Sequence, residues 1–72
     1  MKKEQIGLHA GILWHILNAE KQKMAFNELV VKTALNPIEL ATAIGWLSRE
    51  DKILFSFENG QEYYMVYQEC YY

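Results

Sequence analysis

Cysteine, proline and glycine are scarce in this sequence, and each scarcity excludes a class of protein. Cys70 is the single cysteine, so no disulfide can form within the chain, and a reducing cytoplasm is the expected environment. Four glycines and one proline in 72 residues leave no flexible linker, and the length suits one domain. No apolar run approaches the roughly 18 residues of a membrane span. No signal peptide is expected either, because Met1-Lys2-Lys3 is followed by polar residues.

Basic residues are scarce in the second half of the chain. Residues 1–35 carry five lysines and three glutamates, a net charge of +2. Residues 36–72 carry two basic and six acidic side chains, a net charge of −4. A nucleic-acid-binding domain normally concentrates positive charge on the face that reads the nucleic acid. This charge distribution therefore argues against strong binding of DNA by the second half.

The side-chain combinations that support catalysis or metal binding are also missing. His9 and His15 are the only histidines, and their spacing places them on different sides of a helix, where they cannot share a metal ion. No nucleophile stands beside a recognisable base, and no glycine-rich loop could hold a phosphate. We therefore predict a non-enzymatic protein that needs no cofactor or metal and has no small-molecule substrate.

Apolar residues are abundant, at 51% of the chain, and their spacing predicts the secondary structure. The first predicted helix covers residues 4–18, with a buried face built from positions spaced three and four apart. That face comprises Ile6, His9, Ala10, Leu13, Ile16 and Leu17. Gly7 and Gly11 lie on the opposite side, and each costs about 1 kcal/mol relative to alanine inside a helix. They indicate either a close approach by another backbone or close packing within the domain.

Three shorter elements follow. A short strand is predicted over residues 24–26, and Asn27 is a plausible N-cap for a helix over residues 28–34. The next helix, residues 37–50, has the clearest start in the chain. Asn36 is its N-cap candidate, Pro37 occupies the first helical position, and Glu39 completes a capping-box pattern.

A β-hairpin is predicted over residues 53–68, because Asn59-Gly60 separates two β-rich runs and suits a type I′ turn. A two-residue loop pairs Glu58 with Gln61, Phe57 with Glu62, Phe55 with Tyr64 and Ile53 with Val66. Strand alternation then divides the side chains between two faces. The face expected to cover the core carries Ile53, Phe55, Phe57, Tyr64 and Val66.

The order of these elements resembles the winged helix-turn-helix fold, an α+β architecture of three helices and a small antiparallel sheet. "FNELVVKTALNPIELATAIGWLSREDKI" is similar to the helix-turn-helix portion, and "LFSFENGQEYYMVYQ" to the wing. More narrowly, the chain resembles small stand-alone bacterial winged helix-turn-helix proteins, a family of uncharacterised function. Many relatives have glycine in the inter-helix turn, where this chain has Ala34. Because alanine disfavours a positive φ, a different turn shape is expected here.

The resemblance implies a nucleic-acid-binding, transcription-associated module. Its candidate contacts are Asn36, Thr42, Arg49 and Lys52. Only Arg49 in the predicted recognition helix suits bidentate base recognition, and it lies at the far end of that helix. The wing tip "ENGQE" carries two carboxylates and no basic residue. Duplex DNA binding is therefore expected to be weak, with Lys21, Lys23 and Lys32 as an alternative set of contacts. The second possibility is a protein-interaction or dimerisation module that has lost DNA binding.

The outer face of the hairpin is the candidate protein interface. It carries Leu54, Tyr63, Met65 and Tyr67, with Tyr71 and Tyr72 as an extension if the last strand continues. Tyrosine and methionine are common in protein interfaces, so this face predicts a homodimer. The alternative is an ordinary hydrated sheet surface.

Overall fold

The first helix forms where the apolar spacing predicts it. The computed structural model describes residues 2–67, and helix α1 covers Lys3–Glu20. Ala10, Leu13 and Leu17 are buried along one side. The helix ends at Lys21, whose φ of 54° is left-handed and whose N–H donates to the Leu17 carbonyl over 3.0 Å. None of the helices within residues 2–67 combines the length and apolar character needed to span a bilayer.

The second helix begins earlier than the sequence predicts. Strand β1 covers Met24–Ala25, and helix α2 follows directly as Phe26–Thr33. Asn27 is therefore not the N-cap but lies in the first turn, and Ala25 takes the cap position. The Ala25 N–H donates to the Glu28 carboxylate over 3.0 Å. Glu28 thus satisfies the cap residue's own N–H, which is the half of a capping box that requires no polar side chain at the cap position.

The turn between the second and third helices has the left-handed shape that glycine usually supplies. Ala34 adopts φ 61° and ψ 18°, and its N–H donates to the Val30 carbonyl over 3.1 Å. The expectation that alanine would give this turn a different shape is wrong. The left-handed region disfavours a Cβ atom, so the packing of the flanking helices holds Ala34 in it. Thr33 and Leu35, the residues before and after it, are both buried, and their packing fixes the backbone at Ala34.

Helix α3 covers Pro37–Arg49 and starts with a complete capping box. The Asn36 side-chain oxygen accepts from the Glu39 N–H over 2.8 Å, and the Asn36 N–H donates to the Glu39 carboxylate over 3.0 Å. Both donors would otherwise lack an intrahelical partner. Leu40, Ala43, Ile44 and Leu47 form the buried side of the helix.

We expect Asn36→Ala to lower the free energy of unfolding by about 1 kcal/mol, because it removes the acceptor that caps α3. In a domain of this size the loss corresponds to a fall in Tm of roughly 4–8 °C. Thermal unfolding followed by circular dichroism measures it. Asn36→Asp is the matched control, since its carboxylate keeps the acceptor, and an unchanged Tm in Asn36→Ala would contradict the cap.

The hairpin has the predicted register. Strand β2 covers Ile53–Glu58 and strand β3 covers Gln61–Val66. All four predicted pairs are present, from Glu58 with Gln61 to Ile53 with Val66. Asn59 and Gly60 have φ angles of 51° and 77°, both positive as a type I′ turn requires.

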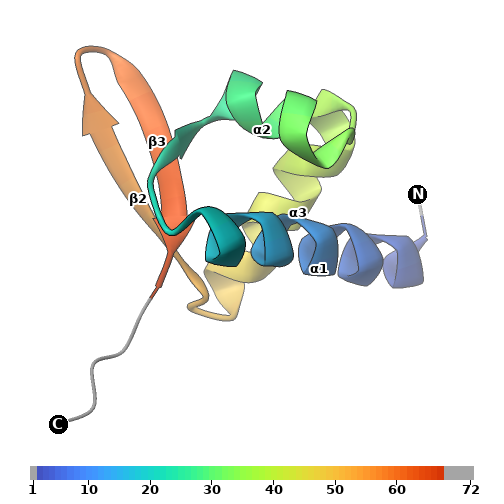
Figure 1. The fold of residues 1–72 in the computed structure, drawn as a ribbon. Coiled ribbons are helices and arrows are strands. Elements are labelled where there is room, and N and C mark those ends of the chain that lie inside the picture. The colour runs from blue at the N-terminus through green and yellow to red at the C-terminus, as the bar shows by residue number, and fades with distance from the viewer. Residues whose placement is uncertain (1, 68–72) are drawn as a thin grey trace, which may run out of the picture.

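The sheet has the order β1-β3-β2, and the three helices cover one of its faces (Figure 1). The core between these layers is formed by leucines of the three helices together with Ile53, Tyr64 and Val66 of the hairpin. The expectation that Phe55 and Phe57 also cover the core is wrong, since they are 50% and 70% exposed. They point to the helical side, but the hairpin extends beyond the helices in Figure 1. The architecture confirms the α+β winged helix-turn-helix fold.

Candidate nucleic-acid and protein interfaces

The four candidate nucleic-acid contacts are not brought together. Asn36 is exposed at the start of α3, and its side-chain oxygen is already used to cap that helix. Thr42 is half-buried and its hydroxyl donates to the Glu39 carbonyl over 2.9 Å. Arg49 closes the helix, about 20 Å from Asn36 at 1.5 Å per residue. Asn36 and Arg49 therefore lie at opposite ends of α3, and Thr42 lies near its middle.

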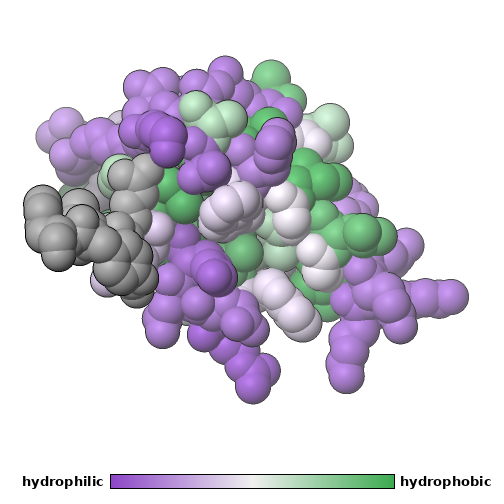
Figure 2. Space-filling view, turned by 60° about the horizontal axis from the view of Figure 1, so that its bottom comes forward, coloured by the Kyte–Doolittle hydropathy of each residue, from purple (hydrophilic) through white to green (hydrophobic). Residues whose placement is uncertain are grey.

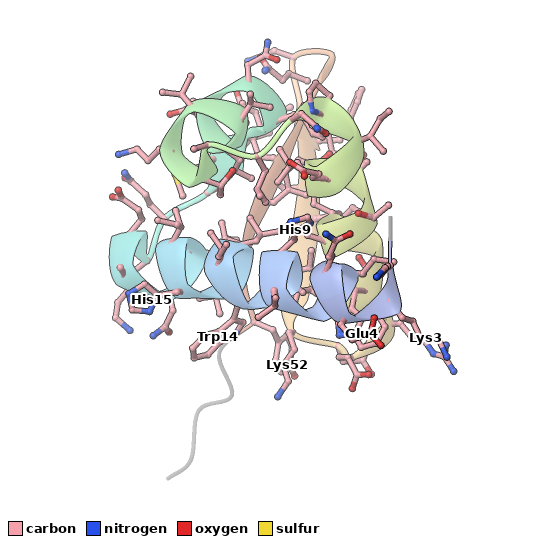
Figure 3. The ribbon with its side chains drawn as sticks, turned by 90° about the vertical axis from the view of Figure 1, so that its right-hand side faces the viewer. Lys3, Glu4, His9, Trp14, His15 and Lys52 are labelled. Carbon is pink, nitrogen blue, oxygen red and sulfur yellow. The ribbon has the colours of Figure 1, made fainter. Side chains whose placement is uncertain are left out.

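Lys52 is exposed just beyond the end of α3, and its backbone holds it in place. Its N–H donates to the Leu47 carbonyl over 2.9 Å, and its carbonyl accepts from the Tyr67 N–H over 2.8 Å. In Figure 3 its side chain projects beside Trp14 of α1, on the side of the molecule away from α2. Lys52 thus adds its charge to the α1 side of the domain, away from the wing tip.

The surface formed by α3 and the wing is apolar and acidic. Ile38 at the start of α3 is 71% exposed, and Phe57 on the wing is 70% exposed. Glu58 and Glu62 add carboxylates near the wing tip. Lys23 binds Glu58 in an ion pair, and its ammonium group lies 5.1 Å from the centre of the Tyr63 ring. The cation closest to the wing is therefore neutralised by a partner 35 residues away, which no local pattern could have predicted.

The structure places the four predicted protein-interface residues on one outer sheet face. The two residues in the middle of that face are partly buried. Leu54 and Met65 are directly paired across the strands, and Tyr63 follows two residues before Met65 on β3. Leu54 and Tyr67 are 44% and 45% exposed, whereas Tyr63 and Met65 are partly buried and less exposed than either. Lys23 lies over Tyr63. Tyr71 and Tyr72, the predicted extension, lie outside the described residues.

A second, largely apolar surface lies between α1 and α3, and only its two glycines could be singled out from the sequence. A groove of about 440 Å³ is lined on one side by residues of α1, namely Gly7, Ala10, Gly11 and Trp14. Its other lining residues belong to α3 and the segment after it, namely Trp46, Leu47, Glu50 and Lys52. Within residues 2–67, a Cβ atom built on Gly7 or Gly11 would meet nothing within 4 Å. The explanation by close packing within the domain is therefore excluded. In the sequence, only the two glycines pointed to this groove. Trp46, on its other side, is 35 positions further along the chain than Gly11.

The two histidines lie on different sides of α1, as their spacing predicts (Figure 3). His15 is exposed, whereas His9 faces α3 and its Nε2 lies 3.7 Å from the Glu39 carboxylate. Its Nδ1 is buried and has no hydrogen-bond partner among the residues that the structure describes. Within residues 2–67, no three His, Cys, Asp or Glu side chains gather where they could hold a metal ion.

Comparison with known proteins is consistent with this geometry. The family described as "Winged helix-turn-helix domain (DUF2582)" matches residues 1–67. This chain belongs to that family. Its fold is similar to the solution NMR structure of protein BT2368 from Bacteroides thetaiotaomicron, with a TM-score of 0.81 and 36% sequence identity. The similarity covers 92% of this chain and 79% of that chain. No curated protein matches this member of the winged helix-turn-helix family.

Proposed function

We propose that this winged helix-turn-helix domain is a non-enzymatic module that acts by binding proteins. The observation that carries the proposal is the surface formed by α3 and the wing. Where a DNA-reading member of the fold needs positive charge, α3 exposes Ile38, and the wing exposes Phe55 and Phe57 beside two glutamates. Phe55 and Phe57 are two positions apart on one face of β2, and exposed apolar groups that lie together are typical of protein contacts. The outer sheet face with Leu54, Tyr63, Met65 and Tyr67 is a second candidate surface for a protein partner.

Duplex DNA is the second candidate partner, because winged helix-turn-helix folds commonly bind DNA. Arg49 and Lys52 are exposed at the end of α3 and support this possibility. Two of the three alternative lysines, Lys23 and Lys32, support it less. Lys32 donates to Glu20 over 2.8 Å, and this partner raises the pKa of Lys32. Lys23 is paired with Glu58. Affinity for DNA depends largely on neutralising phosphates, and these lysines already have anionic partners within the protein.

We expect the domain to bind random-sequence duplex DNA with a dissociation constant of about 10⁻⁴ M or weaker at physiological salt, at the weak end of the non-specific range. Fluorescence anisotropy of a labelled duplex, repeated at several salt concentrations, measures the affinity and its salt dependence. Arg49→Glu should leave the weak binding almost unchanged. Micromolar binding that Arg49→Glu abolishes would overturn the proposal and restore DNA as the partner of α3.

A further inference from the structure

Strand β2 is a free edge of the sheet and lacks the features that normally protect such an edge. The strand order β1-β3-β2 puts it at one side, and it forms the outer margin of the sheet in Figure 1. Edge strands are usually protected by lysine, proline, a bulge or a covering element. The residues Ile53–Glu58 include no lysine or proline, and all six pair with β3 in an unbroken register. Within residues 2–67, no strand pairs with the other side of β2.

The alternation of hydrogen bonds turns the backbone of two phenylalanines outward. The Tyr67 N–H donates to the Lys52 carbonyl over 2.8 Å, so the even-numbered residues of β2 exchange their hydrogen bonds with β3. The N–H and C=O groups of Phe55 and Phe57 therefore point away from β3, toward the free edge. Their side chains are 50% and 70% exposed. The same two residues thus offer both backbone hydrogen bonds and apolar area.

We infer that a second copy of this chain pairs with this edge, β2 against β2 in antiparallel orientation, with Ser56 on the two-fold axis. Phe55 of each copy then lies opposite Phe57 of the other, as a hydrogen-bonded pair. A two-fold interface requires a surface that is complementary to itself, and an antiparallel strand edge meets this requirement. The inference rests on the proposed role in protein binding and names the partner of the wing.

The neighbouring registers fit less well. Residues opposite each other share one face of the sheet, so the pairing can shift only in steps of two residues. An axis at Phe55 places Phe57 opposite Ile53, whose side chain is already buried in the core. An axis at Phe57 places Phe55 opposite Asn59 in the turn. The axis at Ser56 gives both phenylalanines an aromatic partner, and aromatic pairs across strands stabilise a sheet.

The shape of the domain leaves room for this pairing and limits it to two copies. The hairpin extends beyond the helices in Figure 1, so the paired phenylalanines lie clear of the helical layer. Each wing tip reaches the start of the other copy's β2, where Asp51, Ile53, Leu54 and Tyr67 line a hollow of about 300 Å³. The opposite edge of the sheet, β1, has two residues and continues directly into α2. The described part of each copy therefore has one long free edge, and pairing ends at the dimer.

The area suits a weak, reversible dimer. An aromatic side chain offers on the order of 200 Å², so the exposed parts of Phe55 and Phe57 amount to roughly 240 Å² per copy. The paired segment, residues 54–58, is about 17 Å long. The surface buried by both copies therefore stays below about 1,200 Å², in the range of transient contacts. We expect a dissociation constant on the order of 100 µM.

The underside of the domain offers a second copy no comparable fit. Figure 2 shows it from below, where weakly polar and apolar side chains are bordered by hydrophilic groups. It includes the groove between α1 and α3. Backbone groups inside a helix are satisfied within that helix, so this surface has no row of donors and acceptors that would fix a partner in one register.

Sedimentation equilibrium of the full chain, from about 10 µM to about 1 mM, tests the dimer. Phe57→Pro removes an outward N–H and an exposed ring but no hydrogen bond to β3, so the hairpin should form normally. It should weaken the dimer about tenfold or more. Phe57→Lys keeps the N–H and should also weaken the dimer, because lysine on an edge strand opposes pairing. Val31→Glu, at an exposed site on α2, is the control and should dimerise normally.

A cysteine on the two-fold axis tests the register. Opposite residues that are not hydrogen-bonded to each other have Cα atoms about 4.5 Å apart, within the range of a disulfide. In a Cys70→Ser background, Ser56→Cys should therefore give a covalent dimer under mild oxidation, read on a non-reducing gel. Leu54→Cys is the matched control on the same edge and face, because the two copies of position 54 lie about 13 Å apart in this register. Equal cross-linking of the two variants would overturn the inference.

The other outcomes separate the inference from the proposed function. A monomer at about 1 mM, or a dimer that both Phe57 variants leave intact, would overturn the β2 pairing. A dimer lost in Gly11→Glu or in Tyr63→Glu/Met65→Glu, but kept in Phe57→Pro, would also overturn it and would move the contact to the groove or to the outer sheet face. The proposed role in protein binding fails separately, through micromolar DNA binding that Arg49→Glu abolishes.

Discussion

Leu40→Ala is expected to lower the free energy of unfolding by about 2–5 kcal/mol, because it removes buried methyl groups and leaves a cavity. Leu40 is fully buried one turn into α3, within the core formed by all three helices and the hairpin. A domain of 72 residues has a stability of roughly 4–11 kcal/mol at typical values per residue. The substitution therefore removes a large share of the total, and the Tm should fall by at least about 8 °C.

Urea unfolding followed by circular dichroism and tryptophan fluorescence measures this loss. Leu40→Met keeps most of the volume and should cost less than about 1.5 kcal/mol. Val31→Ala truncates a side chain that is 79% exposed, so its effect should stay within about 0.5 kcal/mol. If Leu40→Ala cost no more than Val31→Ala, α3 would not be packed into the core as described, and the placement of Arg49 and Thr42 on its outer side would fail with it.

The hairpin and α3 could be predicted from the sequence because local chemistry determines both. Asn59 and Gly60 accept positive φ angles, and a two-residue loop allows a single register, so every predicted pair follows. In α3, Asn36 and Glu39 satisfy each other's backbone donors within one turn. Neither result depends on what the rest of the chain does.

The errors arise where another interaction competes with the expected local preference. At the start of α2 the competitor is itself local: Asn27 has the better capping side chain, yet the helix starts before it, and Glu28 accepts from the Ala25 N–H three residues earlier. Ala34 takes a left-handed conformation that its side chain disfavours. Alternation correctly placed Phe55 and Phe57 on the helical side of the sheet. Strand alternation does not indicate how far the helices extend beneath the hairpin. The exposure of Phe55 and Phe57 could therefore not be predicted.

The candidate sites divide in the same way. Helical periodicity placed Thr42 and Arg49 on α3, but whether they act on DNA depends on charges that other elements supply. The Lys23–Glu58 pair and the groove between Trp14 and Trp46 each join segments far apart in the chain. Such arrangements follow from how the elements pack, which a single sequence does not specify.

The domain is expected to lose stability between pH 10 and 12 through Tyr64. Burial raises the pKa of the Tyr64 hydroxyl to about 12, and a hydrogen bond to Glu62 and its negative charge act in the same direction. In the unfolded chain the pKa is about 10. Because the folded-state pKa is the higher one, the folded protein holds the proton more tightly. The stabilisation is complete below pH 10 and is lost as the pH rises toward 12.

The free energy of unfolding of the wild type and of Tyr64→Phe, measured by urea titration from pH 9 to pH 12, isolates this contribution. All other ionisable groups are the same in the two proteins, so the difference between the two curves reports Tyr64 alone. Relative to Tyr64→Phe, the wild type should lose on the order of 1–2 kcal/mol across this range, since one unit of pKa corresponds to about 1.4 kcal/mol and solvent screening reduces the full effect. Glu62→Gln removes the neighbouring charge and lowers the folded-state pKa, so the loss should be smaller and should end at a lower pH. Parallel curves for wild type and Tyr64→Phe would show that the Tyr64 hydroxyl ionises as easily in the folded domain as in the unfolded chain. The burial of Tyr64 against the helices would then be wrong, and with it the assignment of the opposite face, with Tyr63 and Met65, to the outside of the sheet.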